Sequence, residues 1–554
     1  MKIKYSLPIA LLLGLGACDV NNDLEEIKAP EGPQAELNVA DVDFSNYISV
    51  GASFTAGFAD NALFKAGQEN SFPNILATKF GLANGGDFNQ PLMSDNVGGL
   101  LLGGTQIQGP RLYFNGTGPT SLATTGATPS TEVTMAVPGS MNNYGVPGAK
   151  SFHFVAPGYG NVAGVALGQA NPYFARFSSS ATATVIGDAA AKLPTFFTLS
   201  EVGGNDVLGY ALAGGIGENQ KGNLDPSTYG PADITDPNVF GNILSGMVDA
   251  LTANPATKGV IANLPYITSL AHFTTVPYNP LDPRTNTDLS GQITLLNNVY
   301  GAVNQVYAAA GEAERSIVFS RDTSNPLVIY DEDATDLTAN IAMALGASPT
   351  FVPFVESLGL PAAAAPLVAQ LLGNQYGKAR SATAQDLFVL PLSSVIGTVN
   401  TDKVAELITA SGGLLPQTLA GQFSAEGITL PLADKWVLTP QEQAEIREAV
   451  DAYNVTIKSI ADSKNLAFVD LNSILETAAN QGLEFDTYIL NTSLVTGGLI
   501  SLDGVHLTGR GYALMANKFL EAIDSKYGTN FKEAKDGLAK ADNYPTNYSP
   551  SLVN

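Results

Sequence analysis

The chain has 554 residues, 27 basic and 51 acidic side chains, a formal net charge of −24 at neutral pH and 45% hydrophobic residues. This charge argues against binding to nucleic acid, whose phosphates it would repel. One cysteine and three histidines exclude a disulfide framework and a thiolate zinc site and argue against a multi-histidine metal centre, whereas carboxylate-only sites for calcium or magnesium stay open.

The first residues are typical of a secretory signal peptide. Lys2 and Lys4 precede an apolar run over 7–15, which is too short to span a bilayer as a mature helix. The Leu-Gly-Ala-Cys sequence that ends at Cys18 resembles a bacterial lipobox. We therefore expect residues 1–17 to be removed and Cys18 to carry the lipid that anchors the chain to a membrane. An ordinary signal peptide with an incidental cysteine is the alternative.

Residues 18–42 are polar, acidic and contain prolines, which is typical of a tether. Their acidic residues weakly resemble a surface-export signal of some Gram-negative lineages. The expected location is therefore the cell envelope of a Gram-negative bacterium, at the outer membrane and exposed on its surface. No later segment has 18 uninterrupted apolar residues, so we expect no transmembrane helix after the signal peptide.

Beyond the tether, short apolar runs that predict strands alternate with helical patterns, in which apolar residues recur every three or four positions. The clearest helix start is a capping box between Thr439 and Glu442, with Pro440 at the first helical position. The alternation predicts an α/β fold with a parallel sheet and helices on both faces. In chain order, we expect a strand over 47–50, a helix over 53–64, a strand over 195–200, a helix over 243–251, a strand over 258–264, a helix over 296–307, a strand over 316–319, the helix from Thr439, a strand over 466–471 and a last helix over 512–523.

Two stretches interrupt this pattern within a domain expected over 43–530, which a tail over 531–554 follows. Residues 85–140 are rich in Gly, Thr, Ser and Pro and predict a long loop insertion. The second insertion, 320–435, contains an Ala-rich apolar part over 351–372 that prolines break into short helices. It is either a helical subdomain packed on the core or a lid over a binding pocket.

Ser53 follows the first predicted strand, within Gly51-Ala52-Ser53-Phe54. The carboxyl end of a parallel strand is the usual ligand position of an open α/β sheet, and the small residues around Ser53 would let a substrate approach. The alternative is a serine that only caps the following helix.

Asp503 and His506 lie three residues apart on a glycine-containing turn before the last helix. A general base needs an imidazole, and a carboxylate can hold that imidazole in the required tautomer. One loop could therefore deliver both groups. The alternative is an aspartate and a histidine on a surface turn.

Two further residues are candidate hydrogen-bond donors. Asn205, after the strand over 195–200, can present a side-chain amide, and Gly148 can present a bare backbone N–H. Together with the N–H of Ser53 they would form a three-donor oxyanion hole. Either could instead be only a turn residue.

These pieces, in this order, resemble the SGNH hydrolases, also called the GDSL esterase/lipase family. The block around Ser53 matches the family's first block, Gly148 its second, the Gly-Gly-Asn-Asp that contains Asn205 its third, and Asp503 with His506 its fifth. The resemblance implies a three-layer α/β/α fold with a parallel central sheet. It also implies a Ser53–His506–Asp503 triad, the oxyanion donors named above, and no metal or organic cofactor.

The sequence departs from the family pattern at two positions. Ala52 stands where the family has aspartate, and Phe54 stands where it has leucine. No Gly-x-Ser-x-Gly elbow surrounds Ser53, which disfavours the α/β-hydrolase fold. His153 and His272 compete as bases, but their aromatic and aliphatic neighbours favour packing or pocket lining.

The resemblance implies a membrane-anchored serine ester hydrolase that cleaves carboxylic esters through an acyl-enzyme. Its expected substrate is a small-molecule, lipid or glycan ester, and the apolar part over 351–372 favours a fatty acyl group. The alternative from another class is a surface lipoprotein that binds glycan or lipid without turnover, which the loss of the family's aspartate at Ala52 keeps open.

Overall fold

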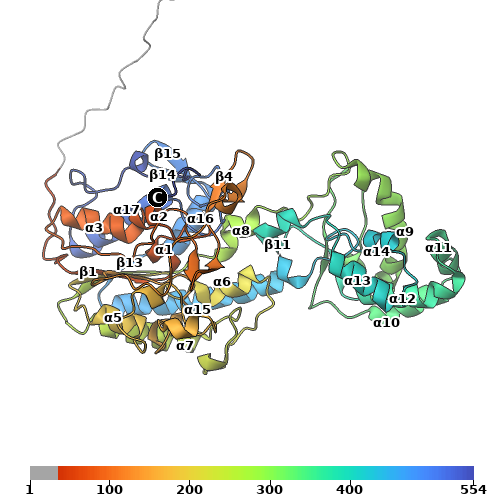
Figure 1. Cartoon of the computed structure of the whole chain (residues 1–554), viewed down its shortest axis with the longest axis horizontal. Helices are drawn as coiled ribbons and strands as arrows, with labels where there is room; N and C mark the ends of the chain where they lie inside the picture. Colours follow the sequence, from red (N-terminus) through yellow and green to blue (C-terminus); the bar gives the residue numbers. More distant parts are fainter. Residues whose placement is uncertain (1–34) are drawn as a thin grey trace, which may run out of the picture.

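A five-stranded parallel sheet forms the centre of the computed structural model, which describes residues 35–554 (Figure 1). The predictions on the signal peptide, on Cys18 and on most of the tether lie outside these residues. The strand order is β13-β8-β7-β1-β6, and every neighbouring pair is parallel. The strands are β1 (Tyr47–Gly51), β6 (Asn143–Gly145), β7 (Phe196–Ser200), β8 (Lys258–Ala262) and β13 (Ala467–Val469).

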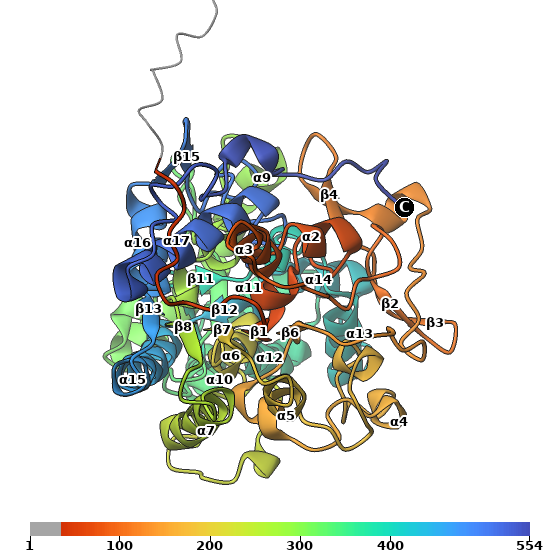
Figure 2. The same ribbon diagram turned by 90° about the vertical axis from the view of Figure 1, so that its left-hand side faces the viewer.

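Helices cover both faces of this sheet (Figure 2). Every residue of β1 and β7 is buried, as expected of parallel strands that are covered on both sides. This arrangement confirms the predicted α/β class with a parallel sheet. One face carries α3 (Phe72–Gly81), α16 (Leu471–Asn480) and α17 (Gly509–Tyr527), and the other carries α5 (Val185–Ala190), α6 (Asn205–Leu212), α7 (Pro237–Leu251) and α15 (Pro440–Ser463).

The capping box predicted at the start of α15 is present. The Thr439 Oγ1 accepts the backbone N–H of Glu442, and a carboxylate oxygen of Glu442 accepts the N–H of Thr439 at 2.5 Å. Two of the otherwise unsatisfied N–H groups at the helix start are satisfied in this way. The apolar residues at helical spacing, Ile446, Val450, Tyr453 and Ile457, are all buried.

Two predicted elements are wrong. The helix expected over 53–64 is only one turn, α1 (Ser53–Ala56), because Gly57 takes a left-handed conformation at φ +82°. Residues 316–319 form no strand. Their backbone N–H groups are instead taken up by asparagine side chains of the preceding helix: Ile317 donates to Asn304, and Phe319 donates to Asn297, each at 2.9 Å.

The loop insertion expected over 85–140 contains two hairpins, followed by β6 of the main sheet, which the sequence did not predict. Between the hairpins, the guanidinium of Arg111 is fully buried and donates to the backbone carbonyls of Tyr548, Ser549 and Leu552. The stretch expected as a tail is therefore packed on the domain. The hairpin strands are β2 (Leu100–Leu102), β3 (Thr105–Gln108), β4 (Leu112–Phe114) and β5 (Pro119–Ser121).

A helical lobe with its own hydrophobic core is inserted between β8 and α15 (Figure 1). Its core runs from Val276 to Val437, so it begins well before the predicted boundary at 320. The short helices expected over 351–372 are present. The lobe contains α9 (Thr287–Ala309), α10 (Thr338–Ala347), α11 (Phe351–Ser357), α12 (Ala365–Tyr376), α13 (Thr401–Ala410), α14 (Gln417–Gln422), β9 (Val328–Tyr330), β10 (Ala379–Ser381), β11 (Leu387–Phe388) and β12 (Val437–Leu438).

Among residues 35–554, no single helix is long and apolar enough to cross a membrane. The pair α10 and α11 meets the length and composition only when its two members are joined, and they are bent by 91°.

The two separate cores predict local rather than global loosening by a lobe mutation. Ile341 is fully buried in the lobe core, so Ile341→Ala removes buried methylene groups and is expected to cost about 2–5 kcal/mol. Hydrogen exchange should accelerate within residues 276–437 and stay unchanged in the central sheet. The matched variant Ile48→Ala, in β1, should loosen the sheet instead. Equal acceleration in both regions with Ile341→Ala would contradict two independent cores.

Candidate active site

The serine lies in a tight turn at the carboxyl end of β1, an inner strand of the sheet. β1 ends at Gly51, and Ser53 begins α1 with 8% of its surface exposed. A Cβ atom on Gly51 would lie 2.2 Å from the Oγ1 of Thr55 and 2.5 Å from the carbonyl of Ser200. Only glycine fits at this position, and it brings the serine close to the end of β7.

The structure brings Ser53, His506 and Asp503 together in one hydrogen-bonded chain. The Oγ of Ser53 lies 2.9 Å from Nε2 of His506, and Nδ1 of the same ring lies 2.9 Å from Oδ2 of Asp503. Serine and histidine are 453 residues apart in the sequence. A base within hydrogen-bond reach of the hydroxyl, oriented by a carboxylate, is the arrangement that activates a serine nucleophile.

The carboxylate of Asp503 is held ionised although it is buried. Burial opposes its charge, but the charge and hydrogen bond of His506 and the backbone N–H groups of His506 and Val505 outweigh burial, so the pKa of Asp503 is well below its usual range. The backbone N–H of Asn61 also donates to its Oδ2, at 2.8 Å. This carboxylate can therefore stabilise a positive charge on the imidazole.

Two phenylalanines and a second histidine fix the position of the His506 loop. The ring of Phe58 lies 4.6 Å from the imidazole, and that of Phe54 lies 5.5 Å from it, measured between ring centroids. Behind the loop, the N–H of His272 donates to the carbonyl of Gly504 at 2.9 Å, and its Nδ1 lies 3.2 Å from the carbonyl of Asp503. His272 thus contacts the loop from behind and not the serine.

The third histidine, His153, also has a structural environment. Its Nδ1 accepts the backbone N–H of Lys150, and its ring stacks on Tyr159 at 4.4 Å between centroids. Burial, and secondarily the charge of Lys150, lowers the pKa of His153 to about 4. Of the three histidines, His506 is the one whose ring is hydrogen-bonded to Ser53.

The predicted oxyanion donors lie after β6 and β7: Gly148 is on the loop that follows β6, and Asn205 begins α6, which follows β7. Asn205 lines the same cavity as Ser53, and its side-chain amide donates to the carbonyl of Ala149 at 3.0 Å, which places it beside Gly148. Gly148 has φ +78°. Within residues 35–554, the backbone N–H of Gly148 donates to no other group. It is therefore free to donate to a substrate oxygen.

Asp206 joins the start of α6 to the loop that follows β6. It is fully buried, and its two carboxylate oxygens accept the N–H and the hydroxyl of Ser151, at 2.7 and 2.6 Å. Burial raises the pKa of Asp206 above its ordinary value, although the hydrogen bonds from Ser151 oppose this shift. The residue after Asn205 thus fixes the position of Gly148, three residues before Ser151.

An apolar cavity of about 110 Å³ opens beside Ser53. Aliphatic side chains form much of its wall, and many of them come from the loop after β8, from α16 and from α17. No residue of the lobe over 276–437 lines it. The wall includes Leu264, Ile267, Leu270, Ile474, Leu475, Leu507, Leu514 and Met515.

The sequence reasoning missed Glu201, which lies directly beneath the serine turn. Its carboxylate accepts the N–H of Thr55 at 2.7 Å. Burial raises the pKa of Glu201 to about 7. Glu201, directly after β7, thus places a carboxyl group close to the serine turn. The residue before Ser53 is Ala52 and not the aspartate of the SGNH pattern, so it supplies no carboxyl group itself. A glutamate at the end of an otherwise apolar strand was the signal that could have revealed it.

Comparison with family models, with curated proteins and with solved structures finds no match.

Burial of Glu201 predicts a pH-dependent stability. The pKa of a glutamate rises here from 4.5 to about 7, so between these pH values the folded chain keeps a proton that the unfolded chain has lost. The free energy of unfolding should therefore fall as pH rises from about 4.5 to 7, by on the order of 3 kcal/mol, and level off above. Glu201→Gln cannot ionise but still accepts the N–H of Thr55, and it should remove this part of the slope. Urea unfolding at several pH values measures it.

The matched variant Glu201→Ala separates the charge from the hydrogen bond. It should lose the same slope but also be less stable than Glu201→Gln at every pH, because the N–H of Thr55 loses its acceptor. A Glu201→Gln profile as steep as that of the wild type would show that Glu201 is not the titrating group.

Proposed function

We propose that this chain is a serine ester hydrolase of the SGNH type, which cleaves carboxylic esters. The observation that carries the proposal is the hydrogen-bonded chain of Ser53, His506 and Asp503 at the end of a buried parallel strand. The candidate donors Gly148 and Asn205 and the apolar cavity beside the serine support it. The position of Glu201 beneath Ala52 weakens the argument for a binding protein without turnover.

In the first half of the reaction, the Oγ of Ser53 attacks the ester carbonyl carbon while Nε2 of His506 takes the hydroxyl proton. Asp503 stabilises the imidazolium that forms. The backbone N–H groups of Ser53 and Gly148 and the amide of Asn205 would donate to the tetrahedral oxyanion. The carbon–oxygen bond to the alcohol then breaks, His506 returns its proton to the leaving alkoxide, and the acyl group stays on Ser53.

In the second half, water replaces the alcohol. His506 takes a proton from water as its oxygen attacks the acyl carbon, and the same donors stabilise the second oxyanion. The bond to Ser53 breaks, and the serine oxygen regains the proton from His506. The carboxylic acid leaves, and Ser53 and His506 return to their starting protonation states.

The cavity wall favours an ester with an aliphatic acyl chain. The aliphatic residues of α16 and α17 would shield methylene groups from water, worth about 0.8 kcal/mol for each group buried. The apolar helices over 351–372, which favoured a fatty substrate in the sequence, lie in the lobe and do not contribute. The preference therefore depends on helices of the α/β domain.

We also propose, from the sequence alone, that Cys18 is lipidated and anchors the enzyme in the cell envelope, at the outer membrane and exposed on the surface. The lipobox resemblance supports this anchor.

The activity is tested with a fluorophosphonate probe and a panel of p-nitrophenyl esters. Wild type should be labelled and should hydrolyse the esters, whereas Ser53→Ala should lose both properties because the nucleophile is gone. Asn205→Ala keeps the nucleophile and should hydrolyse about 10²–10³-fold more slowly. A folded wild-type protein that neither takes the label nor turns over esters would favour the non-catalytic binder of glycan or lipid.

The acyl preference is tested by narrowing the cavity. Ile474 lines the cavity on α16 and is half-buried, so Ile474→Trp can be accommodated while it fills space. It should lower kcat/KM for octanoyl and decanoyl esters at least about tenfold and spare acetyl esters, since loss of two buried methylene groups is worth roughly that factor. Glu476→Trp, exposed on the same helix, is the control. Equal losses on all chain lengths would place the acyl chain elsewhere.

A further inference from the structure

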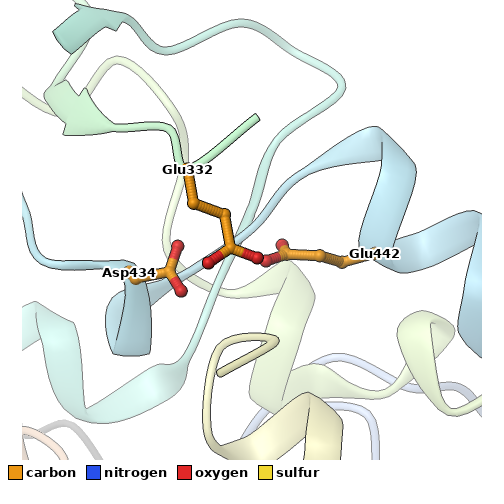
Figure 3. Close-up of side chains that lie close together, drawn as sticks. All are labelled: Glu332, Asp434 and Glu442. Carbon is orange, nitrogen blue, oxygen red and sulfur yellow. The ribbon is translucent and has the colours of Figure 1, made fainter. Parts of the chain in front are cut away.

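Three carboxylates converge where the helical lobe joins the α/β domain (Figure 3). Glu332 follows β9 of the lobe, Asp434 lies in the segment that returns from the lobe, and Glu442 lies in the first turn of α15. One oxygen from each residue lies within 4.8 Å of the other two. In Figure 3 the carboxylate of Glu332 lies between the other two and faces both of them.

The negative charges of this cluster have no partner of opposite sign among residues 35–554. None of the three carboxylates forms an ion pair there. Two lysines close in the chain make other contacts: Lys378 donates to the backbone carbonyl of Glu332, and Lys435 lies over the ring of Trp436. The neighbouring Asp331 already pairs with an arginine.

Glu442 is 3% exposed, yet only half of its carboxylate is satisfied. One oxygen accepts the N–H of Thr439 in the capping box. The other, Oε1, is buried and has no hydrogen-bond partner within the described chain, and the same holds for Oδ1 of Asp434. A buried carboxylate oxygen without a donor is costly, so each such atom requires an explanation.

The turn after α6 packs closely against two members of the cluster. A Cβ atom on Gly215 would lie 2.1 Å from Oε1 of Glu442, and one on Gly214 would lie 2.4 Å from the carbonyl of Asp434. Both glycines have positive φ. The turn that follows α6 therefore lies directly against the carboxylate of Glu442 and the backbone of Asp434.

We propose that Glu332, Asp434 and Glu442 bind a hard divalent cation of the Ca²⁺ class at the junction of lobe and domain. Three carboxylates form an all-oxygen ligand set, and Ca²⁺ binds such oxygens at about 2.3–2.6 Å, so two ligands across the ion lie about 4.6–5.2 Å apart. The exposed side of Glu332 leaves room for water ligands. The site is separate from Ser53 and does not depend on the proposed hydrolase activity.

The ion would connect the lobe to the α/β domain. Glu332 belongs to the lobe and Glu442 to a helix of the central domain, so one cation bound to both would resist their separation. Because only the folded chain brings the three residues together, binding should raise the midpoint of thermal unfolding as the ion concentration rises.

The single tryptophan provides a direct test. Trp436 lies two residues after Asp434, and Tb³⁺, which takes the same oxygen ligands as Ca²⁺, emits when a nearby indole is excited. The full chain, freed of metal with a chelator, should sensitise Tb³⁺, and added Ca²⁺ should abolish the emission at lower concentration than Mg²⁺. Calorimetry with Ca²⁺ alone should give one site per chain.

Variants at the site distinguish specific binding from general attraction to an acidic protein. Glu332→Gln and Glu442→Gln should each weaken Ca²⁺ binding at least about tenfold, since each removes a charged ligand. Glu442→Gln keeps an acceptor for Thr439, and Glu332 is exposed, so both variants should fold. Asp333→Asn, an exposed neighbour, is the control and should bind as wild type does.

Two outcomes would overturn the proposal. One is the absence of calorimetric heat and of a thermal shift with Ca²⁺ and Mg²⁺ in the wild type. The other is an equal loss of affinity in Asp333→Asn and Glu332→Gln, which would mean that the ion senses only the net charge. Trp436→Phe should lower the Tb³⁺ emission while leaving the Ca²⁺ affinity unchanged.

Discussion

The geometry of the site depends on hydrogen bonds that hold the loop over 501–508 against residues 58–61, which follow α1. The hydroxyl of Ser501 accepts the N–H of Asp60, whose carboxylate in turn accepts the N–H of Leu502 at 3.0 Å, and Tyr512 donates to the carbonyl of Phe58. Because these bonds lie on both sides of the Asp503–His506 pair, the imidazole stays within reach of the serine. These bonds hold Nε2 of His506 at 2.9 Å from Oγ of Ser53, although the two residues are 453 positions apart in the sequence.

The cost of this arrangement is visible in the buried acids around it. Burial raises the pKa of Asp60 to about 7, and the negative charge of Asp503 adds to that shift. Burial raises the pKa of Glu201 to the same value. Asp60 and Glu201 also have positive φ, which side chains other than glycine rarely adopt. Strain and desolvation thus concentrate on the residues that shape the serine turn and the acid loop, as is common where geometry matters more than stability. The aliphatic packing of α16, α17 and the sheet provides the compensating stability.

Local signals explain what the sequence predicted well. The strand runs, the capping box at Thr439 and the short blocks around Ser53, Asn205 and His506 each depend on a few consecutive residues, and parallel strands bring their carboxyl ends to one edge. What the sequence missed depends on distant partners. Residues 316–319 look like a strand because they contain an apolar run, but asparagines on α9 accept the backbone N–H groups of Ile317 and Phe319. The role of Glu201 appears only when β7 lies beside β1, and β6 is a three-residue strand without an apolar run of its own.

The acidic cluster could not be predicted from the sequence for the same reason, since its three members come from positions 332, 434 and 442. Their meeting point also has a place in the architecture. Helix α6 begins with Asn205 at the serine cavity and ends at the Gly214–Gly215 turn, which presses against Asp434 and Glu442. One eight-residue helix, about 12 Å long, therefore touches both the catalytic candidates and the lobe junction. The lobe, which contributes nothing to the cavity wall, therefore adjoins the far end of the helix that carries a proposed oxyanion donor.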